Sequence, residues 1–359
     1  MASVPTLPSH PSQVTPEWLT EALRERFPTA SVASIETLEV HEGTNSNARL
    51  RVAYHAPCEL PETFFLKLPP FDPARRAAVN RTGMGRREAL FYRTLADHVP
   101  MRVPRPFVAR FDESSGAFVL LIEDLETTSC TIPDPVEGLG VEQALLAMRD
   151  YARLHVRYEN EARRRREAGW VERMPEGSEY GTTMLQYGLD HHRDRLTDAF
   201  AELATLYIER QADLEAVWVR GRITVLQGDG HIANLFVDDG QPGFLDWGLI
   251  QLGTPLRDVG FFITMALSPA NRREHERALI ARYLEARLEA GGEPISFEDA
   301  WLTHRVLATY AVPASCQIVL FPENVGPERK RLASAFLERC ECVIEDLDAR
   351  GALREVAGI

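Results

Sequence analysis

The sequence has few cysteines, and it shows neither a signal-peptide pattern nor a long apolar run. Five cysteines in 359 residues are an odd number at scattered positions, which argues against a disulfide framework and fits a reducing compartment. The N-terminal residues have no charged start followed by an apolar segment, and no apolar stretch approaches the ~20 residues of a membrane helix. We therefore expect a cytoplasmic protein with no membrane partner.

The sequence also lacks an excess of basic residues. Its 40 lysines and arginines face 53 aspartates and glutamates, which gives a formal net charge of −13. Binding of nucleic acid through its phosphates needs clustered positive charge, so no nucleic-acid partner is expected. The acidic balance is compatible with a cationic small substrate, although such a balance more often serves only solubility. At 359 residues the chain is long enough for one large domain or for two lobes.

The first 125 residues are dominated by the alternation of apolar and polar residues that is typical of strands. Thr15 and Pro16 begin a helix, as N-cap and first helical residue, that continues to about Phe27. Strands are expected within 35–54, where a polar turn at 41–47 separates two of them, and at 63–68, 106–111 and 117–122. With a helix at 85–98, this part predicts a sheet of about five strands and one crossing helix.

After Asp124 the pattern becomes mainly helical. Helices are expected at about 139–166, 183–218, 271–290, 297–317 and 328–349, interrupted by one strand-rich segment at 223–247. The arginine run 163–166 is bracketed by Glu161 and Glu167, which favours a solvated helix face. The sequence therefore predicts an α+β protein with a sheet-containing part at 1–125 and a helical part at 126–359.

The strand-rich segment holds the residues with the clearest chemical meaning. A loop carries Asp229, His231 and Asn234, and a hairpin then leads to Asp246. Phosphoryl transfer needs this set, because one carboxylate orients the attacking hydroxyl while an amide and a second carboxylate hold Mg²⁺ on the phosphates. Each Asp-Gly pair alone could be an ordinary turn. The joint pattern favours the catalytic interpretation.

These residues resemble the catalytic and metal-binding loops of the aminoglycoside phosphotransferase and choline kinase superfamily. The resemblance is carried by Gly228-Asp229-x-His231-x-x-Asn234 and Leu245-Asp246-Trp247, and it extends over about 40–320. Within that superfamily the chain is most similar to the phosphotransferase-enzyme and ecdysteroid-kinase-like branch. The resemblance implies a protein-kinase-like, two-lobed fold with an N-terminal antiparallel sheet plus a helix and a larger, mainly helical C-terminal lobe.

The resemblance also implies roles for single residues. Asp229 would be the catalytic carboxylate, and Asn234 and Asp246 would be Mg²⁺ ligands. Lys67 would contact the α- and β-phosphates of ATP, and Glu88 on the following helix would pair with it. A lysine among apolar strand residues is costly to bury without a partner, although it could also extend from a strand end toward water.

Further contacts to ATP are expected from the backbone. The turn that contains Gly43 would cover the phosphates with its N–H groups. The carbonyl of Glu123 and the N–H of Leu125 would bind the adenine edge if 122–126 is the hinge between the lobes.

Five positions need separate comment. The superfamily often has His at the place of Gln227, and Gln can substitute if that side chain only braces the loop. Trp247 stands where kinases often have Phe and should keep its packing role. Asp258 is expected to be buried and bonded to backbone N–H groups near 227–231, and His155, like His231, is expected to brace loops rather than bind metal.

The sequence thus predicts an ATP- and Mg²⁺-dependent O-phosphotransferase that acts on a small-molecule alcohol, and the resemblance slightly favours a neutral or apolar one. An aminoglycoside acceptor is the alternative, and a nucleotide-binding pseudokinase is the alternative of another class. The acceptor is expected near 155–220 and the last helices. That region offers aromatic and acidic residues: Trp170, Tyr180, Tyr187, Trp301 and Tyr310, with Glu172, Glu176, Glu179 and Asp190.

Overall fold

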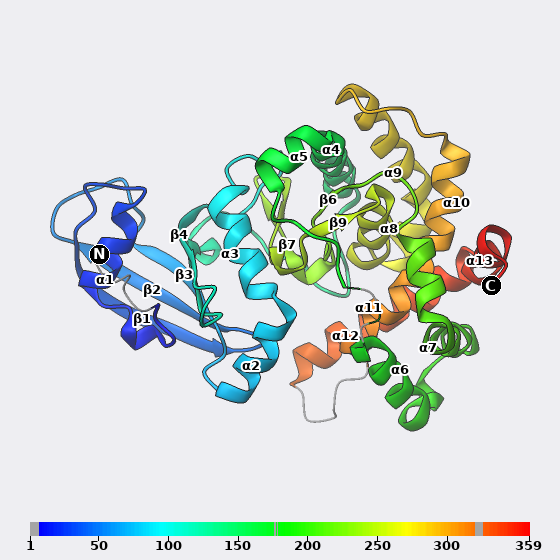
Figure 1. Cartoon of the computed structure of the whole chain (residues 1–359), viewed down its shortest axis with the longest axis horizontal. Coiled ribbons are helices and arrows are strands. Elements are labelled where there is room, and N and C mark those ends of the chain that lie inside the picture. Colours follow the sequence, from blue (N-terminus) through cyan, green and yellow to red (C-terminus); the bar gives the residue numbers. More distant parts are fainter. Residues whose placement is uncertain (1–6, 176, 178, 320–325) are drawn as a thin grey trace. The chain divides into compact units, whose positions relative to one another are not determined.

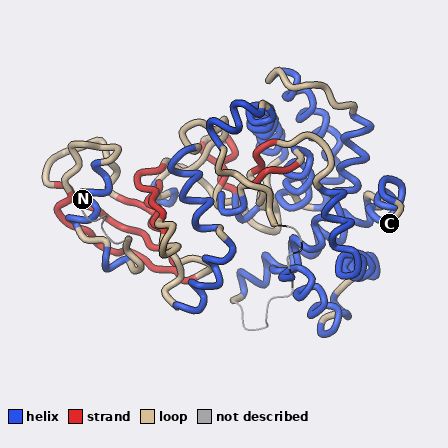
Figure 2. Tube along the Cα trace, viewed as in Figure 1, coloured by secondary structure: helices blue, strands red, loops and turns tan. Residues whose placement is uncertain are grey.

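The chain divides into two compact units. In the computed structural model, which describes residues 7–175, 177, 179–319 and 326–359, one unit comprises Met1–Cys130 with Gly243–Ile250, and the other Thr131–Pro242 with Gln251–Ile359. Strands predominate in the first unit and helices in the second (Figure 2). The α+β fold class predicted from the sequence is therefore confirmed. The segment Gly243–Ile250, which carries Asp246, belongs to the first unit.

The first unit is built on one antiparallel sheet of five strands (Figure 1). The strand order is β1-β2-β3-β5-β4, and each neighbouring pair is antiparallel. The strands are β1 Val32–Glu42, β2 Ser46–Tyr54, β3 Thr63–Leu68, β4 Pro106–Phe111 and β5 Phe118–Glu123. All five lie where the sequence predicted strands.

The two faces of this sheet differ because side chains alternate along each strand. On β3, Phe64 and Leu66 join the core that α1 (Pro16–Arg24) completes through Leu19 and Leu23. Lys67 follows Leu66 along the strand and takes the opposite face, where α3 (Met84–Thr94) supplies its partner. The alternation of β3 therefore separates an apolar core from a charged site.

Two helices of the first unit differ from the prediction. Helix α2 (Pro73–Thr82) was not predicted, because none of its residues is buried and it has no apolar periodicity. Its N-terminus follows the standard rule, since the Asp72 side chain accepts a hydrogen bond from the N–H of Arg75 and Pro73 is the first helical residue. Helix α3 ends at Thr94, four residues earlier than expected.

The second unit is mainly helical. Its α-helices are α4 Val141–Glu159, α5 Glu161–Ala168, α6 Glu179–His191, α7 Asp198–Trp218, α8 Pro255–Ala266, α9 Pro269–Glu289, α10 Phe297–Leu307, α11 Ala311–Val319, α12 Pro327–Asp346 and α13 Ala349–Ala357. All twelve residues of α8 are buried. This helix, which was not predicted, is the centre of the second unit.

Three of the long helices expected in this unit are interrupted. The one expected at 139–166 breaks at Asn160, whose side chain caps α5. The one expected at 183–218 is divided between α6 and α7 by the 3₁₀ turn η3 (Arg193–Arg195), and the one expected at 297–317 by η6 (Ala308–Tyr310). The helical period of the apolar residues does not reveal these breaks, because both halves of each segment keep an apolar face.

Two short strand pairs flank the predicted catalytic loop. Strand β6 (Thr224–Leu226) pairs with β9 (Gln251–Gly253), and β7 (Leu235–Asp238) forms the expected hairpin with β8 (Gln241–Phe244). In the part of the chain that the structure describes, no helix combines the length and apolar character that a bilayer span requires.

Candidate active site

The first unit brings three of the predicted residues together around one ammonium group. Nζ of Lys67 lies 2.7 Å from Oε2 of Glu88 and 3.4 Å from Oδ2 of Asp246. Lys67 and Glu88 are buried, while the side chain of Asp246 keeps 35% of its exposure. The predicted pairing of Lys67 with Glu88 is confirmed. The cluster carries two carboxylates for one ammonium, so it holds one negative charge in excess.

Burial and the neighbouring charges together determine which group of the cluster takes up a proton most easily. Burial alone would lower the pKa of Lys67, but the charges of Asp246 and Glu88 outweigh it and raise the pKa, so Lys67 stays charged. Burial raises the pKa of Glu88 to about 7, an effect that Lys67 opposes and Asp246 increases. Glu88 is therefore the member of the cluster that takes up a proton near neutral pH.

Asp246 is fixed by its backbone and by the residues that follow it. Its φ is 45°, a left-handed conformation in which its side chain caps the 3₁₀ turn η5 (Trp247–Leu249) through the N–H of Gly248. The ring of Trp247 stacks on Phe91 at a centroid distance of 3.8 Å, and Nε of Arg87 donates to the carbonyl of Gly248 at 2.7 Å. The packing role expected for Trp247 is therefore confirmed.

Helix α3 organises this site, which the sequence showed only in part. It supplies Glu88 to the lysine, Arg87 to the turn after Asp246, and Phe91 to Trp247. The roles of Arg87 and Phe91 were missed, although their spacing of four residues places both on one helix face. Because α3 makes all three contacts, a shift of this helix would change the positions of Lys67 and Asp246 together.

The turn between β1 and β2 has the polar character expected of it. The N–H of Gly43 donates to the carbonyl of Asn45, and the carbonyl of Gly43 accepts from Arg75 on α2. The Asn45 side chain is buried and its Oδ1 receives no hydrogen bond from the described residues. The phosphate-covering role of this turn stays a prediction.

The segment expected to bind adenine follows β5. Glu123 ends the strand, and Leu125 begins the 3₁₀ turn η2 (Leu125–Thr127). Between them, the buried Asp124 is held by Arg49 of β2, with 3.1 Å between Nη2 and Oδ2. This buried ion pair, which the sequence did not reveal, fixes the chain at the position expected for the hinge.

The second unit brings together the residues of the predicted catalytic loop. Nδ2 of Asn234 donates to Oδ2 of Asp229 at 2.9 Å and to its carbonyl at 3.0 Å. Nε2 of His231 lies 3.4 Å from the same carboxylate. Because the Asn234 amide nitrogen is engaged with Asp229, its amide oxygen is the atom suited to a cation. A shared cleft with Asp246, which belongs to the other unit, stays a prediction.

Backbone interactions fix the loop around Asp229. The N–H of Asp229 donates to Oε1 of Gln227 at 2.7 Å, so Gln227 braces the loop as expected. Gly228 has a φ of 88°, where glycine is strongly favoured. A Cβ on Gly230 would collide with the hydroxyl of Tyr151. The loop therefore depends on small residues and on hydrogen bonds made by its backbone.

Asp258 on α8 is the brace that the sequence predicted. Its carboxylate accepts from the N–H of Gln227 at 2.7 Å and from the N–H of Gly228 at 3.0 Å, and the residue is buried. Nε2 of His155 lies 3.3 Å from Oδ2 of Asp258. Both predictions, a buried brace at Asp258 and a loop-bracing His155, are confirmed.

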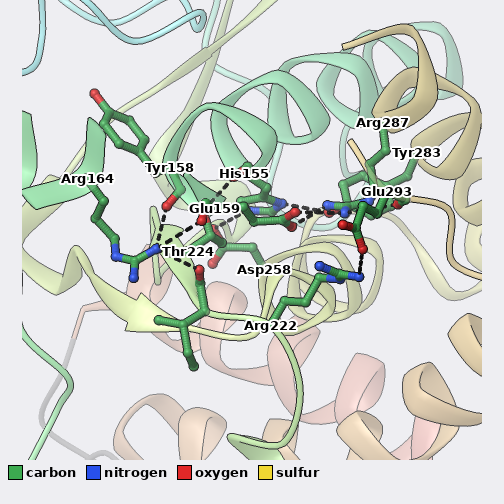
Figure 3. A network of polar contacts seen from close by, with 11 residues as sticks. His155, Tyr158, Glu159, Arg164, Arg222, Thr224, Asp258, Tyr283, Arg287 and Glu293 are labelled. Atoms are coloured by element: carbon green, nitrogen blue, oxygen red, sulfur yellow. Dashed lines mark hydrogen bonds and ion pairs between the residues drawn. The ribbon is translucent and has the colours of Figure 1, made fainter. Parts of the chain in front are cut away.

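A relay of polar side chains extends from this brace (Figure 3). Nδ1 of His155 lies 2.9 Å from the hydroxyl of Tyr283, which in turn lies 3.3 Å from Nη1 of Arg287. Arg287 pairs with Glu159 at 2.6 Å. Sequence patterns did not reveal this relay, because its members come from α4, α8 and α9, far apart along the chain.

The arginine run at 163–166 only partly matches its prediction. Arg163, Arg165 and Arg166 form ion pairs on the exposed face of α5. Arg164 instead turns inward and donates to the carbonyls of Tyr158 and Ile223 at 2.7 and 3.0 Å (Figure 3). It therefore fastens α5 to the residue that precedes β6.

The residues predicted to hold Mg²⁺ fit that ion by their chemistry. Mg²⁺ prefers oxygen ligands and usually retains water and substrate phosphates, so a protein need supply only one or two groups. Asp246 and Asn234 offer a carboxylate and an amide oxygen. Within the described residues, no group of three or more His, Cys, Asp and Glu side chains could hold a metal without such help.

Two of the aromatic residues expected near the acceptor are exposed on α6. Tyr180 and Tyr187 retain 53% and 45% of their exposure. Tyr310 instead packs in a cluster with Trp218 and Phe261. Glu176 lies outside the described residues. The acceptor assignment of these residues stays a prediction.

Comparison with known proteins supports the interpretation as a phosphotransferase at the level of family and fold. Residues 37–301 match the phosphotransferase enzyme family. No curated protein matches the chain. Two solved structures are similar over nearly the whole chain, a putative aminoglycoside phosphotransferase from Ralstonia eutropha and a choline kinase from Cryptosporidium parvum.

The degree of similarity limits what each comparison shows. The Ralstonia structure has a TM-score of 0.50 and 16% identity, covering 92% of this chain and 98% of that chain. The Cryptosporidium structure has a TM-score of 0.50 and 11% identity, covering 89% of this chain and 91% of that chain. At such identities the similarity shows the fold alone. The family match spans most of the sequence, and the chain belongs to the phosphotransferase enzyme family.

Proposed function

We propose that this protein transfers the γ-phosphoryl group of ATP to a hydroxyl of a small molecule, with Mg²⁺ as the metal. The observation that carries the proposal is the buried Lys67, held between Glu88 at 2.7 Å and Asp246 at 3.4 Å. A purely structural lysine would need one carboxylate. The second carboxylate, still 35% exposed, gives the cluster an excess negative charge that suits a cation.

In this proposal the first unit binds the nucleotide. Lys67 contacts the α- and β-phosphates, and Glu88 keeps its ammonium group in place. The backbone at Gly43 covers the phosphates, while Glu123 and Leu125 offer a carbonyl and an N–H to the adenine edge. Bound Mg²⁺, held by Asp246 and Asn234, would neutralise charge on the β- and γ-phosphates.

Asp229 acts on the acceptor. Its side chain is 22% exposed, and its carboxylate accepts a hydrogen bond from Asn234. A carboxylate in this position orients the acceptor hydroxyl and accepts its proton as the phosphoryl group is transferred. His231 and Asn234 keep the carboxylate in one orientation, so little reorganisation is needed during the reaction.

The experiment that tests the proposal is a coupled assay of ADP release. Purified protein with Mg·ATP is offered sterol-like alcohols, hydroxy acids, sugars, amino alcohols and aminoglycosides. Transfer to at least one alcohol, lost in Asp229→Asn, supports a small-molecule kinase. Mg·ATP binding without transfer to any alcohol would favour a nucleotide-binding pseudokinase instead. Absence of saturable Mg·ATP binding would contradict both.

A further inference from the structure

One buried arginine in the second unit lacks the partners that the others have. Of the residues that the structure describes, four arginines are buried: Arg257, Arg272, Arg287 and Arg339. Arg272 pairs with Glu276 and Arg287 with Glu159, while Arg339 donates to two backbone carbonyls. The guanidinium of Arg257 has no hydrogen bond or ion pair to any described residue, and its Nη2 is fully buried.

The position of Arg257 increases the free-energy cost of burying its unpaired charge. The residue is only 8% exposed, and it lies in the first turn of α8, whose N-cap Thr254 provides no side-chain hydrogen bond. Helix N-termini carry partial positive charge and disfavour a cation. The adjacent carboxylate, that of Asp258, is already bonded to two backbone N–H groups and to His155. Among the described residues, no carboxylate pairs with the positive charge that gathers here.

The surroundings of the guanidinium are aromatic. Arg257 lies over the ring of Tyr310 at 4.9 Å from its centroid, and a Cβ on Gly253 would come within 3.9 Å of Nη1. Phe261 and Trp218 meet the same ring edge-on at 5.7 and 5.3 Å. A cation–π contact offsets only part of the cost of burying a charge. Water could accept a hydrogen bond here, but it would not neutralise the charge.

We propose that Arg257 and Tyr310 form a binding site for an oxyanion, a carboxylate or phosphate, on the acceptor alcohol. The inference rests on the proposed function and narrows its acceptor class to alcohols that carry an acidic group. A guanidinium binds such a group through two parallel hydrogen bonds, and the aromatic residues suit an apolar portion of the same molecule. Asp258, the next residue, braces the backbone of the catalytic loop. The first turn of α8 therefore carries both the proposed oxyanion-binding Arg257 and the brace of the catalytic loop.

The first experiment compares acceptors that differ only in charge. Hydroxyhexanoate is tested against its methyl ester, and glycerol phosphate against glycerol, by coupled ADP release. At least one charged member should be the better substrate. For Arg257→Met, the KM of that charged acceptor should rise by at least about tenfold, while the KM of its uncharged counterpart stays the same. Arg257→Lys keeps the charge without the planar fork and should give an intermediate KM.

Stability measurements distinguish a binding role from a structural one. Arg257→Met removes an unpaired buried charge, so the Tm of the free protein should be unchanged or higher. Arg287→Met leaves Glu159 without its partner and should lower the Tm by several degrees. Arg220→Met is the charge-matched control: this arginine is exposed, its side chain donates to the carbonyl of Val356, and its replacement should leave KM and Tm unchanged.

Calorimetry without nucleotide separates failure of this inference from failure of the proposed function. Charged alcohols should bind the wild type and bind Arg257→Met at least about tenfold more weakly. If uncharged alcohols or aminoglycosides are phosphorylated well and Arg257→Met changes no KM, the inference is wrong and the kinase function stands. If charged compounds bind through Arg257 but no alcohol accepts phosphate, the proposed function and the acceptor assignment both fail. A Tm loss in Arg257→Met equal to that in Arg287→Met would also overturn the inference.

Discussion

The two units hold their functional carboxylates in different ways. In the first unit, Asp246 and Glu88 share the ammonium of Lys67, so the arrangement depends on balance among three charges. In the second unit, Asp229 is held by neutral groups, through Asn234 and the side chain of Gln227. Loss of a charge should therefore disturb the first site throughout. Loss of one neutral bond should disturb the second only locally.

The same difference explains which substitutions the two sites tolerate. The side chain of Gln227 accepts a hydrogen bond from the N–H of Asp229, and another side chain with an acceptor can make the same bond. Lys67 has no such substitute, because removing it leaves two carboxylates facing each other. The predictions that follow test this contrast, beginning with the largest effect.

Replacement of each central carboxylate should give different losses in the two units. Asp229→Asn should lower kcat by about a thousandfold, or about 4 kcal/mol, and leave Mg·ATP affinity nearly unchanged, because Asp229 acts on the acceptor. Asp246→Asn removes a negative charge next to Lys67 and should weaken Mg·ATP binding as well as turnover. Excess Mg²⁺ should partly restore that binding. Calorimetric titration of Mg·ATP beside steady-state rates measures both, and the opposite pattern would reverse the two assignments.

Removal of the central cation should be the largest stability effect in the first unit. Lys67→Met leaves Glu88 and Asp246 without their shared partner, and we expect a loss of about 3 kcal/mol in unfolding free energy at pH 8. The loss should be smaller at pH 6, where Glu88 takes up a proton. The exposed pair Arg26–Asp97 provides the control, since Arg26→Met should cost less than about 1 kcal/mol. Equal losses in both variants would show that the cluster is not a coupled charge site.

Protonation of Glu88 should make the stability of the free protein depend on pH. Burial raises the folded-state pKa of Glu88 to about 7 from 4.5. Its stabilising contribution is therefore complete below about pH 4.5 and is lost as the pH rises through about 7. Relative to Glu88→Gln, wild-type stability should fall by up to about 1.4 kcal/mol per pH unit between about pH 5 and 7. Urea unfolding at several pH values measures this, and a pH-independent difference would contradict it.

Local sequence rules predicted the first unit well and the second unit less completely. All five strands of the sheet lie where alternation and turn residues placed them. Helices α2 and α8 were missed although both begin with a cap residue followed by proline, Asp72-Pro73 and Thr254-Pro255, the signal used at Thr15-Pro16. Their apolar patterns concealed them, since α2 buries no residue and α8 buries every one.

The site was predictable where its residues are close in sequence or carry a motif. The loop from Gln227 to Asn234 and the brace at Asp258 were foreseen. The pairs Arg49–Asp124 and Arg287–Glu159 were not, because they join residues 75 and 128 positions apart. Sequence patterns report local period and capping, whereas such pairs depend on tertiary packing that brings separate elements together. The partnerless Arg257 could be recognised only against the paired arginines of the same unit.

The smallest expected effect concerns the relay behind the catalytic loop. Tyr283→Phe removes the hydroxyl that joins His155 to Arg287 and leaves the ring packed, so stability should fall by about 1 kcal/mol (Figure 3). If the relay positions Asp258, the amides of Gln227 and Gly228 should also lose protection in hydrogen exchange, and kcat should fall more than KM changes. The control is Tyr54→Phe in the first unit, whose hydroxyl donates only to the carbonyl of Pro61 among the described residues. It should cause a similar loss of stability without exposing those two amides. If the amides of Gln227 and Gly228 are equally protected from hydrogen exchange in both variants, the relay has only a structural role. Asp258 would then be positioned by its hydrogen bonds to the backbone alone.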